Sequence, residues 1–378
     1  MTPNTQCMSV NWRSTFLSAM RALENNLLIL CQISMRPLKE KHVSASHLRS
    51  YLARQSCKSL TKLTICMTLV SCVMGYGMNY SCAEHVEGNI TTFPEHPIHK
   101  TIVEEFSESD RTESSRRHLR QVSALLHLAE EEGLVGAGTC YVELGAGKGH
   151  MSYYAWQAWG SQGGAVVLLD RAALRHKRDN KLRAARRLRA DLRHVALARL
   201  DDVAAAPALL ALAKHLCGVA TDYALRCVTA EAGAGPRRRG VLLATCCHHR
   251  CELAAFLAPG PLQELGITGE EFNVMLGIVS WATCGDGRSR DARNKPDHAG
   301  DGGEPAVREE TEPAAVKEAE RVILPQESRE AVGRRAKQLL DWLRVLRLRE
   351  LGFDARLCFY VPVTVSPENV CIVAKKFS

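Results

Sequence analysis

Short apolar runs and amphipathic segments alternate through the middle of the chain. Leu119, Val122 and Leu125 recur at helical spacing ahead of Gly133, which predicts a helix ending there. Strands are predicted at residues 139–143, 165–170, 209–214 and 241–246, with helices from about residue 150, after residue 170 as a basic segment, and at 222–228. This alternation predicts an α/β fold with a doubly wound, mostly parallel sheet.

The C-terminal end of the chain predicts a helix followed by two strands. Leucines recur at helical spacing through residues 334–351. Two β-rich runs, 358–363 and 370–374, flank the turn-forming sequence Ser-Pro-Glu-Asn at 366–369. We expect a terminal hairpin that closes the sheet with an antiparallel edge.

These elements assign one folded domain to residues 113–378. Within it, residues 286–320 carry ten acidic and six basic residues with almost no large apolar side chain, which predicts a disordered insertion. Residues 1–112 form an atypical N-terminal region without a sustained period. Their six cysteines lack the Cys-x2-Cys spacing of a zinc site, so the role of this region stays open.

Composition narrows the setting of the protein. The 15 cysteines are scattered along the chain, which predicts a reducing compartment, the cytoplasm or the nucleus, rather than a disulfide framework. The apolar run at 63–78 is shorter than the ~20 residues of a spanning helix. No membrane association and no obligate protein partner are expected. The net charge of +8 favours polyanionic partners.

A glycine-rich turn follows the first strand of the domain. Glu143 ends that strand, and Gly145, Gly147 and Gly149 follow at intervals of two. A dinucleotide site needs a glycine three positions beyond Gly147, where this chain has His150. The spacing instead fits a site for S-adenosylmethionine (SAM), in which no pyrophosphate needs a helix N-terminus. A tight strand-to-helix turn without a ligand explains the pattern equally well.

Two acidic residues extend the predicted cofactor site. Asp170 ends the second strand, 21 residues after Gly149, where a carboxylate can accept both ribose hydroxyls of a cofactor. Asp191 lies in the loop after a third strand, where it would cover the adenine. A role in balancing the neighbouring arginines is an equal alternative for Asp191.

Positive charge is concentrated between these acids. Residues 171–199 hold eleven arginines and lysines against Asp179 and Asp191. A one-sided basic face favours nucleic acid, because each neutralised phosphate releases counterions. A solvated helix is the alternative explanation. The RNA-binding candidates in this segment are Arg175, Lys177, Arg178, Lys181 and Arg183.

The next two strands deliver candidate catalytic residues to the same edge of the sheet. Lys214 and His215 end one strand, where they would orient or deprotonate a substrate hydroxyl. His248 follows the other strand as a third catalytic candidate, with His249 and Arg250 near the RNA backbone. In the alternative, Lys214 pairs with an acid and His215 bonds the backbone.

Cysteine and histidine, the ligand types of a structural zinc site, occur together at residues 246–251, as Cys246, Cys247, His248, His249 and Cys251. Successive side chains of a strand point to opposite faces, so contiguous ligands cannot converge on one tetrahedral ion without a sharp bend. We therefore expect no metal here and favour a substrate-facing edge.

With these residues in view, residues 116–378 resemble the eukaryotic tRNA methyltransferases that modify the ribose 2′-hydroxyl of the fourth nucleotide of the acceptor stem. The motifs that carry the resemblance lie, in order, at 142–149, 214–222, 224–227, 246–251 and 280–285. The resemblance implies SAM as cofactor and a tRNA acceptor stem as partner. It also implies that the pocket of Glu143, the glycines, Asp170 and Asp191 holds the cofactor, while Lys214, His215 and the 246–251 edge receive the ribose.

Two departures from the family are evident. The first hundred residues lack the Cys/His spacing of the family's N-terminal zinc modules, and Asp170 stands where the family tends to have glutamate. Two alternative functions therefore remain open: a non-catalytic methyltransferase-like RNA-binding subunit, and a methyltransferase acting on another RNA or on protein.

Overall fold

The computed structural model describes residues 86, 88–175, 178–182, 185–230, 236, 238–265, 267–284 and 326–377. The apolar run at 63–78, the insertion predicted at 286–320, and the candidates Lys177 and Arg183 lie outside these residues. Within the described part of the chain, no helix has both the length and the apolar character that a membrane crossing requires.

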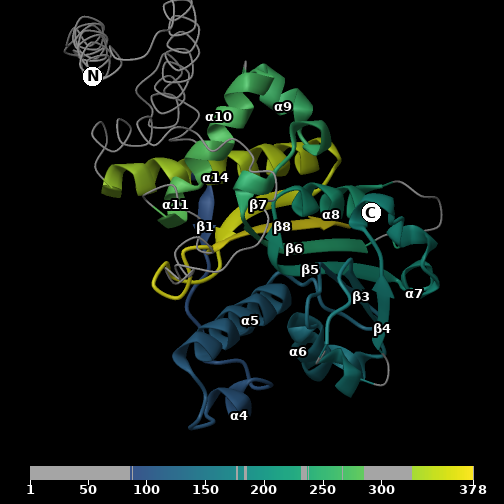
Figure 1. Cartoon of the computed structure of the whole chain (residues 1–378). Helices are drawn as coiled ribbons and strands as arrows, with labels where there is room; N and C mark the ends of the chain where they lie inside the picture. Colours follow the sequence, from purple (N-terminus) through teal and green to yellow (C-terminus); the bar gives the residue numbers. More distant parts are fainter. Residues whose placement is uncertain are drawn as a thin grey trace, which may run out of the picture. The chain divides into compact units, whose positions relative to one another are not determined.

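A mixed sheet forms the centre of the described chain, with strand order β1-β7-β8-β6-β5-β2-β3-β4 (Figure 1). The strands are β1 (Ile90–Thr92), β2 (Cys140–Leu144), β3 (Val166–Asp170), β4 (Ala185–Arg189), β5 (Ala208–Cys217), β6 (Arg238–Cys246), β7 (Asp354–Phe359) and β8 (Val370–Lys376). Strand β8 runs antiparallel to both of its neighbours, β6 and β7, and the other described pairings are parallel. The predicted α/β class and the antiparallel C-terminal strands are confirmed.

Helices cover both faces of this sheet. The α-helices are α4 (Val103–Phe106), α5 (Glu113–Glu131), α6 (His150–Trp159), α7 (Asp201–Ala204), α8 (Val219–Thr229), α9 (Pro259–Glu264), α10 (Gly269–Val279), α11 (Trp281–Cys284) and α14 (Gln326–Glu350). Short 3-10 turns are η2 (Gly160–Gln162), η3 (Asp179–Lys181), η4 (Leu192–His194), η5 (Leu197–Arg199), η6 (His248–Arg250) and η7 (Leu253–Ala255). Helices α5 and α6 pack on one face, and α8, α10 and α14 on the other (Figure 1).

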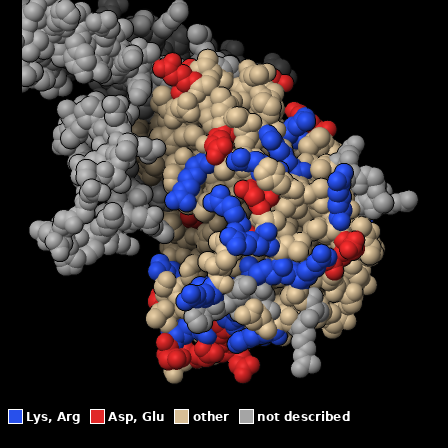
Figure 2. Space-filling model, turned by 45° about the vertical axis from the view of Figure 1, so that its right-hand side comes forward, with Lys and Arg blue, Asp and Glu red and all other residues tan. Residues whose placement is uncertain are grey.

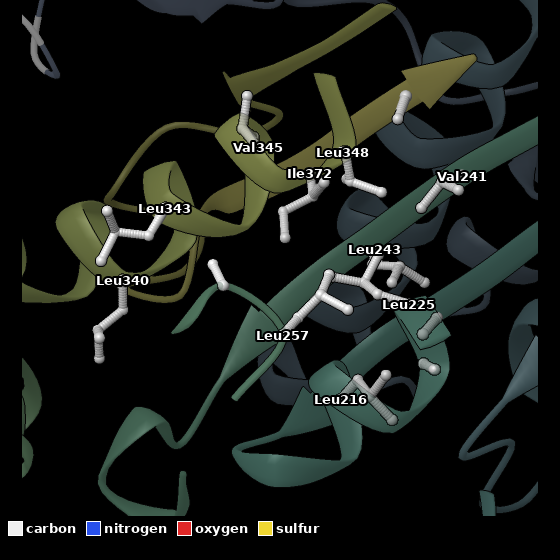
Figure 3. Packing of buried hydrophobic residues seen from close by; sticks show 14 of the residues in the cluster. Leu216, Leu225, Val241, Leu243, Leu257, Leu340, Leu343, Val345, Leu348 and Ile372 are labelled. Atoms are coloured by element: carbon white, nitrogen blue, oxygen red, sulfur yellow. The ribbon is translucent and has the colours of Figure 1, made fainter. Parts of the chain in front are cut away.

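The alternation of side chains along each strand divides the core into two layers. In β2, Tyr141 packs in the layer under α5 and α6, whereas Val142 packs in the layer under α8 and α14. Figure 3 shows part of the second layer, in which Leu348 of α14 lies near Ile372 of β8. Burying a leucine side chain of this kind contributes roughly 1.5–3 kcal/mol. Both faces of the strands are thus apolar, as is typical of parallel strands covered by helices on both sides.

Local signals explain where the helix before β2 begins and ends. The Thr112 side chain accepts a hydrogen bond from the amide of Ser115 and caps the start of α5. Gly133, at a φ of 63°, follows the end of α5 in the left-handed conformation that glycine tolerates best. The helix predicted to end at Gly133 is therefore confirmed.

The basic segment after β3 differs from the expectation. Its predicted helix is wrong: the segment contains the turn η3 and the edge strand β4. Strand β4 carries Arg186, Arg187 and Arg189. From the sequence alone, such a run of arginines cannot be distinguished from the exposed face of a helix. Charged side chains on an edge strand also discourage pairing with another chain, so arginines suit this position.

The opposite edge of the sheet also differs. The C-terminal hairpin forms, but β1 pairs in parallel outside β7, with Ile90 opposite Leu357, so the hairpin is not the edge. Strand β1 precedes the boundary expected at residue 113 and joins the same sheet. The hairpin could be recognised from local turn chemistry, whereas a three-residue strand far away in sequence gives no comparable signal.

Candidate active site

The predicted glycines form the turn from β2 into α6. Gly145, Gly147 and Gly149 have φ angles of 68°, 52° and 73°, a region that favours glycine. A Cβ added to Gly145 would lie 2.7 Å from Cδ1 of Leu216, so a side chain at this position would require Leu216 to move. The space in front of Gly147 is open, with no atom within 4 Å of an added Cβ. The loop therefore offers bare backbone to a ligand.

Glu143 holds this loop from beneath. Its side chain is buried, and its Oε2 accepts a hydrogen bond from the amide of Ser152 at 2.8 Å. That amide belongs to the first turn of α6, where carboxylates are favoured by the helix dipole. Glu143 thus fixes the distance between the strand end and the helix start.

Asp170 joins the glycine loop to the end of β3. Its Oδ2 accepts from the amide of Gly147 at 2.6 Å, and its Oδ1 accepts from the amide of Ala172 at 2.7 Å. The carboxylate is half-buried, and each oxygen keeps further lone pairs for a ligand diol. Asp170 therefore lies against the open glycine turn, where the sequence predicted a cofactor-binding carboxylate.

Asp191 follows β4, one strand further along the sheet. Its Oδ1 accepts from the amide of Arg193 at 2.9 Å, so it caps the turn η4. Arg193 in turn lies over the ring of Tyr223. The described contact of Asp191 is a backbone cap, which leaves its role toward adenine a proposal.

Lys214 lies at a bulge near the end of β5. The pairing of β5 with β6 shifts between Lys214 and Leu216, and His215 adopts a φ of 61°. Nζ of Lys214 is 2.9 Å from Nδ1 of His118 on α5. Burial lowers the pKa of Lys214 to about 8, although the charges of Glu143 and Cys246 oppose this shift. A lysine with this pKa can accept a proton near neutral pH.

His215 points to the same helix. Its Nε2 lies 2.8 Å from Oε1 of Gln121, and its ring meets that of His118 edge to face. The positive φ of His215 is uncommon outside glycine. The bulge therefore directs both Lys214 and His215 toward α5, a helix from which the sequence named no site residue.

His248 occupies a different environment from the one expected. Its side chain is 2% exposed, and its Nε2 lies 2.9 Å from Oδ2 of Asp341 on α14. Arg344 binds the other oxygen of Asp341 and both oxygens of Asp222. His248 therefore belongs to a buried polar network and does not reach solvent, so the structure does not support its expected place beside the ribose.

Asp341 carries charge within this network. Burial alone would raise the pKa of its carboxyl, but His248 and Arg344 hold that pKa well below its usual range. The Thr245 hydroxyl donates to the same carboxylate at 2.7 Å. These contacts fasten α14 to the end of β6 and to α8.

The cysteines at this edge converge, contrary to the expectation that contiguous residues at the end of a strand point to opposite faces. Cys247 takes a φ of 47°, which provides the sharp bend that the sequence argument required. As a result, the thiol sulfurs of Cys217, Cys246 and Cys247 all lie within 4.8 Å of one another. Hydrogen bonds with Cys217 and Cys246 lower the pKa of Cys247, and the charges of His249 and Arg250 lower it further. His249 and Arg250 are exposed beside this cluster.

The described basic candidates divide into two groups. Arg175 and Lys181 are exposed, as RNA contact requires. Arg178 instead pairs with Glu105 of α4 and lies over the rings of Tyr153 and Tyr154, so it ties the segment after β3 to the helices. Because the guanidinium of Arg178 already contacts Glu105 and the two tyrosine rings, the structure does not support the expectation that Arg178 binds RNA. Figure 2 shows Lys and Arg side chains gathered on one face, with a few acidic side chains among them.

A cavity of about 510 Å³ lies away from all these residues, between α8, α9 and the end of α14. Arg226, Leu257, Pro261 and Arg347 are among its lining residues. Its lining includes none of the candidate site residues, and the chemistry described above therefore belongs to the strand ends instead.

Three residues at the site escaped the sequence argument. His118 and Gln121 come from α5, and Asp341 comes from α14, each 93 to 96 residues from its partner in the sequence. Asp341 lies among the leucines of a helical pattern and gives no motif. Gln121 is a polar residue on the buried face of α5, and this break in the apolar pattern is a signal that could have pointed to it.

Gly147 leaves an open cradle of backbone, and the carboxylate of Asp170 lies on its rim. An open backbone turn with a carboxylate on its rim, at the strand ends of a mixed α/β sheet, is compatible with the class of SAM-dependent methyltransferases. The family model described as Methyltransferase TRM13 matches residues 120–375. The chain belongs to this family.

Three curated relatives are named as tRNA:m(4)X modification enzymes. The chain is 27% identical over 344 residues to the tRNA:m(4)X modification enzyme TRM13 homolog of Mus musculus, covering 76% of this chain and 70% of that protein. It is 30% identical over 291 residues to the tRNA:m(4)X modification enzyme TRM13 of Yarrowia lipolytica, covering 69% and 60%. The human homolog is 26% identical over 317 residues, covering 69% and 65%. The chain thus spans 60 to 70% of the length of these relatives.

Among solved structures, the chain is similar to the mitomycin 7-O-methyltransferase at 13% identity. The match covers 82% of this chain and 67% of that protein, with a TM-score of 0.30, which is too low to support an argument about the fold.

Proposed function

We propose that this chain transfers a methyl group from SAM to the ribose 2′-hydroxyl of the fourth nucleotide in a tRNA acceptor stem. The observation that carries the proposal is the bulge of β5, which sets Lys214 beside the glycine loop. Strands β2 and β5 are neighbours, and Leu216 touches the position where Gly145 lacks a side chain. A lysine with a pKa of about 8 therefore lies next to the cofactor cradle.

The cofactor half of the site comprises the glycine loop, Asp170 and Asp191. The backbone of Gly145, Gly147 and Gly149 lies against the amino-acid part, Asp170 accepts the ribose hydroxyls, and Asp191 covers the adenine. When bound, SAM supplies an electrophilic methyl group on a sulfonium sulfur. The open space at Gly147 and the spare lone pairs of Asp170 support this assignment.

Lys214 acts on the attacking hydroxyl. A ribose hydroxyl is a poor nucleophile at neutral pH, so a nearby base increases its reactivity. Neutral Lys214 accepts the hydroxyl proton at Nζ, and the adjacent His118 holds the amine in place from α5. His215, bonded to Gln121, positions the bulge. His248 is a positioning residue, because its contact with Asp341 helps to fasten α14 to the end of β6.

The RNA is held by exposed basic residues around the strand ends. Arg175 and Lys181 are exposed in the segment after β3, and His249 and Arg250 are exposed next to Cys247 in the sequence. Charged side chains of this kind bind phosphates without reading sequence. The choice of tRNA rests on the names of the relatives, all of which are tRNA modification enzymes.

The parallel strands from β4 to β6, with helices on both faces, support a Rossmann-like doubly wound layout as part of this proposal. The described cysteines are free thiols, which supports a reducing compartment, either cytoplasm or nucleus.

The test is methyl transfer from labelled SAM to unmodified tRNA by the purified full chain, without any partner protein. Mass spectrometry of the nuclease digest then locates the methyl group. We expect a 2′-O-methylated nucleotide at acceptor-stem position 4. A methyl group on a base, or on another RNA or on protein only, would overturn the substrate. SAM binding without any transfer would favour a non-catalytic RNA-binding subunit.

A further inference from the structure

Three thiols meet where strands β5 and β6 end. Cys217 and Cys246 are the last residues of the two strands and lie directly opposite each other in the sheet. Their sulfurs are 3.2 Å apart. Cys247 turns its thiol back to the same point, so all three sulfurs lie within 4.8 Å of one another. All three cysteines are free.

The backbone around this cluster is held in an unusual conformation. Among the described residues, only His215 and Cys247 are non-glycine residues with a positive φ, and both lie at this edge. Strained backbone persists where surrounding contacts hold it, and it is concentrated at functional sites. A bend at Cys247 is also what converts two contiguous cysteines into a convergent pair.

Packing fixes the bend in place. The amide of Gly218 donates to the carbonyl of Cys246 at 3.1 Å. A Cβ at Gly218 would lie 2.5 Å from the backbone carbonyl of Arg250, so the loop after β5 touches the turn after Cys247. The three thiols are thus arranged by the fold before any ligand arrives.

The geometry suits a thiolate metal site. Zinc binds cysteine sulfur at about 2.3 Å, which in a tetrahedron separates two sulfurs by about 3.8 Å. The observed spacing, 3.2 Å between the sulfurs of Cys217 and Cys246 and at most 4.8 Å between any two of the three, is compatible with that value. Soft thiolate ligands select zinc over calcium or magnesium. Cys217 and Cys247 are half-buried, which leaves the outer side of the cluster accessible.

We propose that Cys217, Cys246 and Cys247 bind one Zn²⁺ ion as three thiolates, with a fourth position open toward solvent. The ion joins the ends of β5 and β6 directly beyond the bulge that carries Lys214. Its role is to fix the edge that receives the substrate. A disulfide between two of these cysteines is the competing chemistry, and it requires an external two-electron oxidant.

The test is the zinc content of the full chain, purified under reducing conditions and measured by elemental mass spectrometry. Cys217→Ser and Cys247→Ser should each contain one zinc equivalent less than the unaltered chain. Cys227→Ser is the matched control, because its thiol lies outside the cluster and donates to the carbonyls of Leu192 and Val195, as a serine hydroxyl can. Comparing variants removes any contribution from zinc bound elsewhere.

A second measurement stands even if a cluster variant fails to fold. Replacement of zinc by Co²⁺ in the unaltered chain should produce thiolate-to-cobalt charge-transfer absorption, and removal of metal with a chelator should lower its melting temperature. Equal zinc content in the unaltered chain and in folded Cys247→Ser would overturn the proposal. So would cluster cysteines that all react with a thiol reagent in the metal-loaded chain, or an intact mass reduced by a pair of hydrogens, which indicates a disulfide.

Discussion

The two halves of the candidate site are built by different means. In the cofactor half, Glu143 accepts from the amide of Ser152, and Asp170 accepts from the amides of Gly147 and Ala172. In the substrate half, Lys214 contacts His118, and His248 contacts Asp341, across 96 and 93 residues. The first half is local, and the second is assembled by tertiary packing.

This difference bears on how each half tolerates change. Backbone amides cannot be mutated away, so the cofactor half depends mainly on a few carboxylates and on glycine φ angles. The substrate half depends on side chains from α5 and α14, each held by core packing. A mutation in the substrate half therefore alters the protonation of its neighbours and the stability of the fold, as well as the contact with the substrate.

Lys214→Ala should have the largest effect on turnover. Loss of a positioned base lowers kcat by about 10²–10⁴-fold. SAM affinity should stay unchanged, because the cofactor half keeps its own contacts. Lys214→Arg should fail likewise, since arginine does not deprotonate. Single-turnover kinetics measure the rate of methyl transfer, and calorimetry measures SAM affinity. Lys375→Ala is the control, because Lys375 pairs with Glu132 and is not a candidate site residue. Equal loss of SAM affinity would show that the halves are not separate.

Asp170→Ala should mainly affect cofactor binding. Hydrogen bonds to a charged group contribute about 1.5–3 kcal/mol each, so losing two to a ribose diol weakens SAM by about 10²-fold or more. The loop also loses its tie at Gly147. Calorimetry measures the change, with the exposed Asp201→Ala as control. Unchanged affinity in Asp170→Ala would remove this residue from the pocket.

The local backbone geometry of the cofactor half could be predicted from the sequence. Gly145, Gly147 and Gly149 form the predicted turn between strand and helix, with positive φ angles, and Asp170 ends its strand as expected. The reason is that strand, turn and acid are contiguous, so local rules decide them. Strands β2, β3, β5 and β6 were predictable for the same reason.

The substrate half could not be predicted in the same way. The residue types at Lys214 and His248 indicated chemistry, but only the fold shows that Lys214 meets α5 and that His248 is buried against α14. The bend at Cys247 was likewise hidden, because alternation along a strand argues against convergence. Edge strands β1 and β4 depend on neighbours that local patterns do not reveal.

Asp341→Ala should reduce stability more than any single change in the cofactor half. It leaves Arg344 and His248 buried without their shared carboxylate, and breaking a buried ion pair costs about 3–5 kcal/mol. Because the folded pKa of Asp341 is depressed, its stabilisation is present above the usual aspartate pKa of about 3.9 and is lost as pH falls through the folded value. Urea unfolding at pH 7 and at low pH measures both effects. A loss of stability that does not shrink at low pH would contradict the ionic account.

The rate should also depend on pH through Lys214. Burial lowers the pKa of Lys214 to about 8, while His118 on α5, Glu143 on β2 and Cys246 on β6 face it. The neutral amine is the active form, so kcat should rise about tenfold per pH unit below 8 and level off above it. Lys214→Ala should flatten this limb of the profile. A rate that falls as pH rises through 8 would mean that the protonated amine is the active form.

The smallest effects are expected from the exposed basic residues. Arg175→Ala and Lys181→Ala each remove one phosphate contact, so tRNA affinity should fall only severalfold and the log–log salt dependence should decrease by about one per contact. SAM binding and the kcat at saturating tRNA should not change. Filter binding across a salt series makes the check, with the exposed Lys100→Ala as control. If the salt slope stays constant in the double variant, the RNA binds along the His249 and Arg250 side of the site. In that case the cofactor half binds only SAM, and the substrate half binds both the reacting ribose hydroxyl and the RNA phosphates.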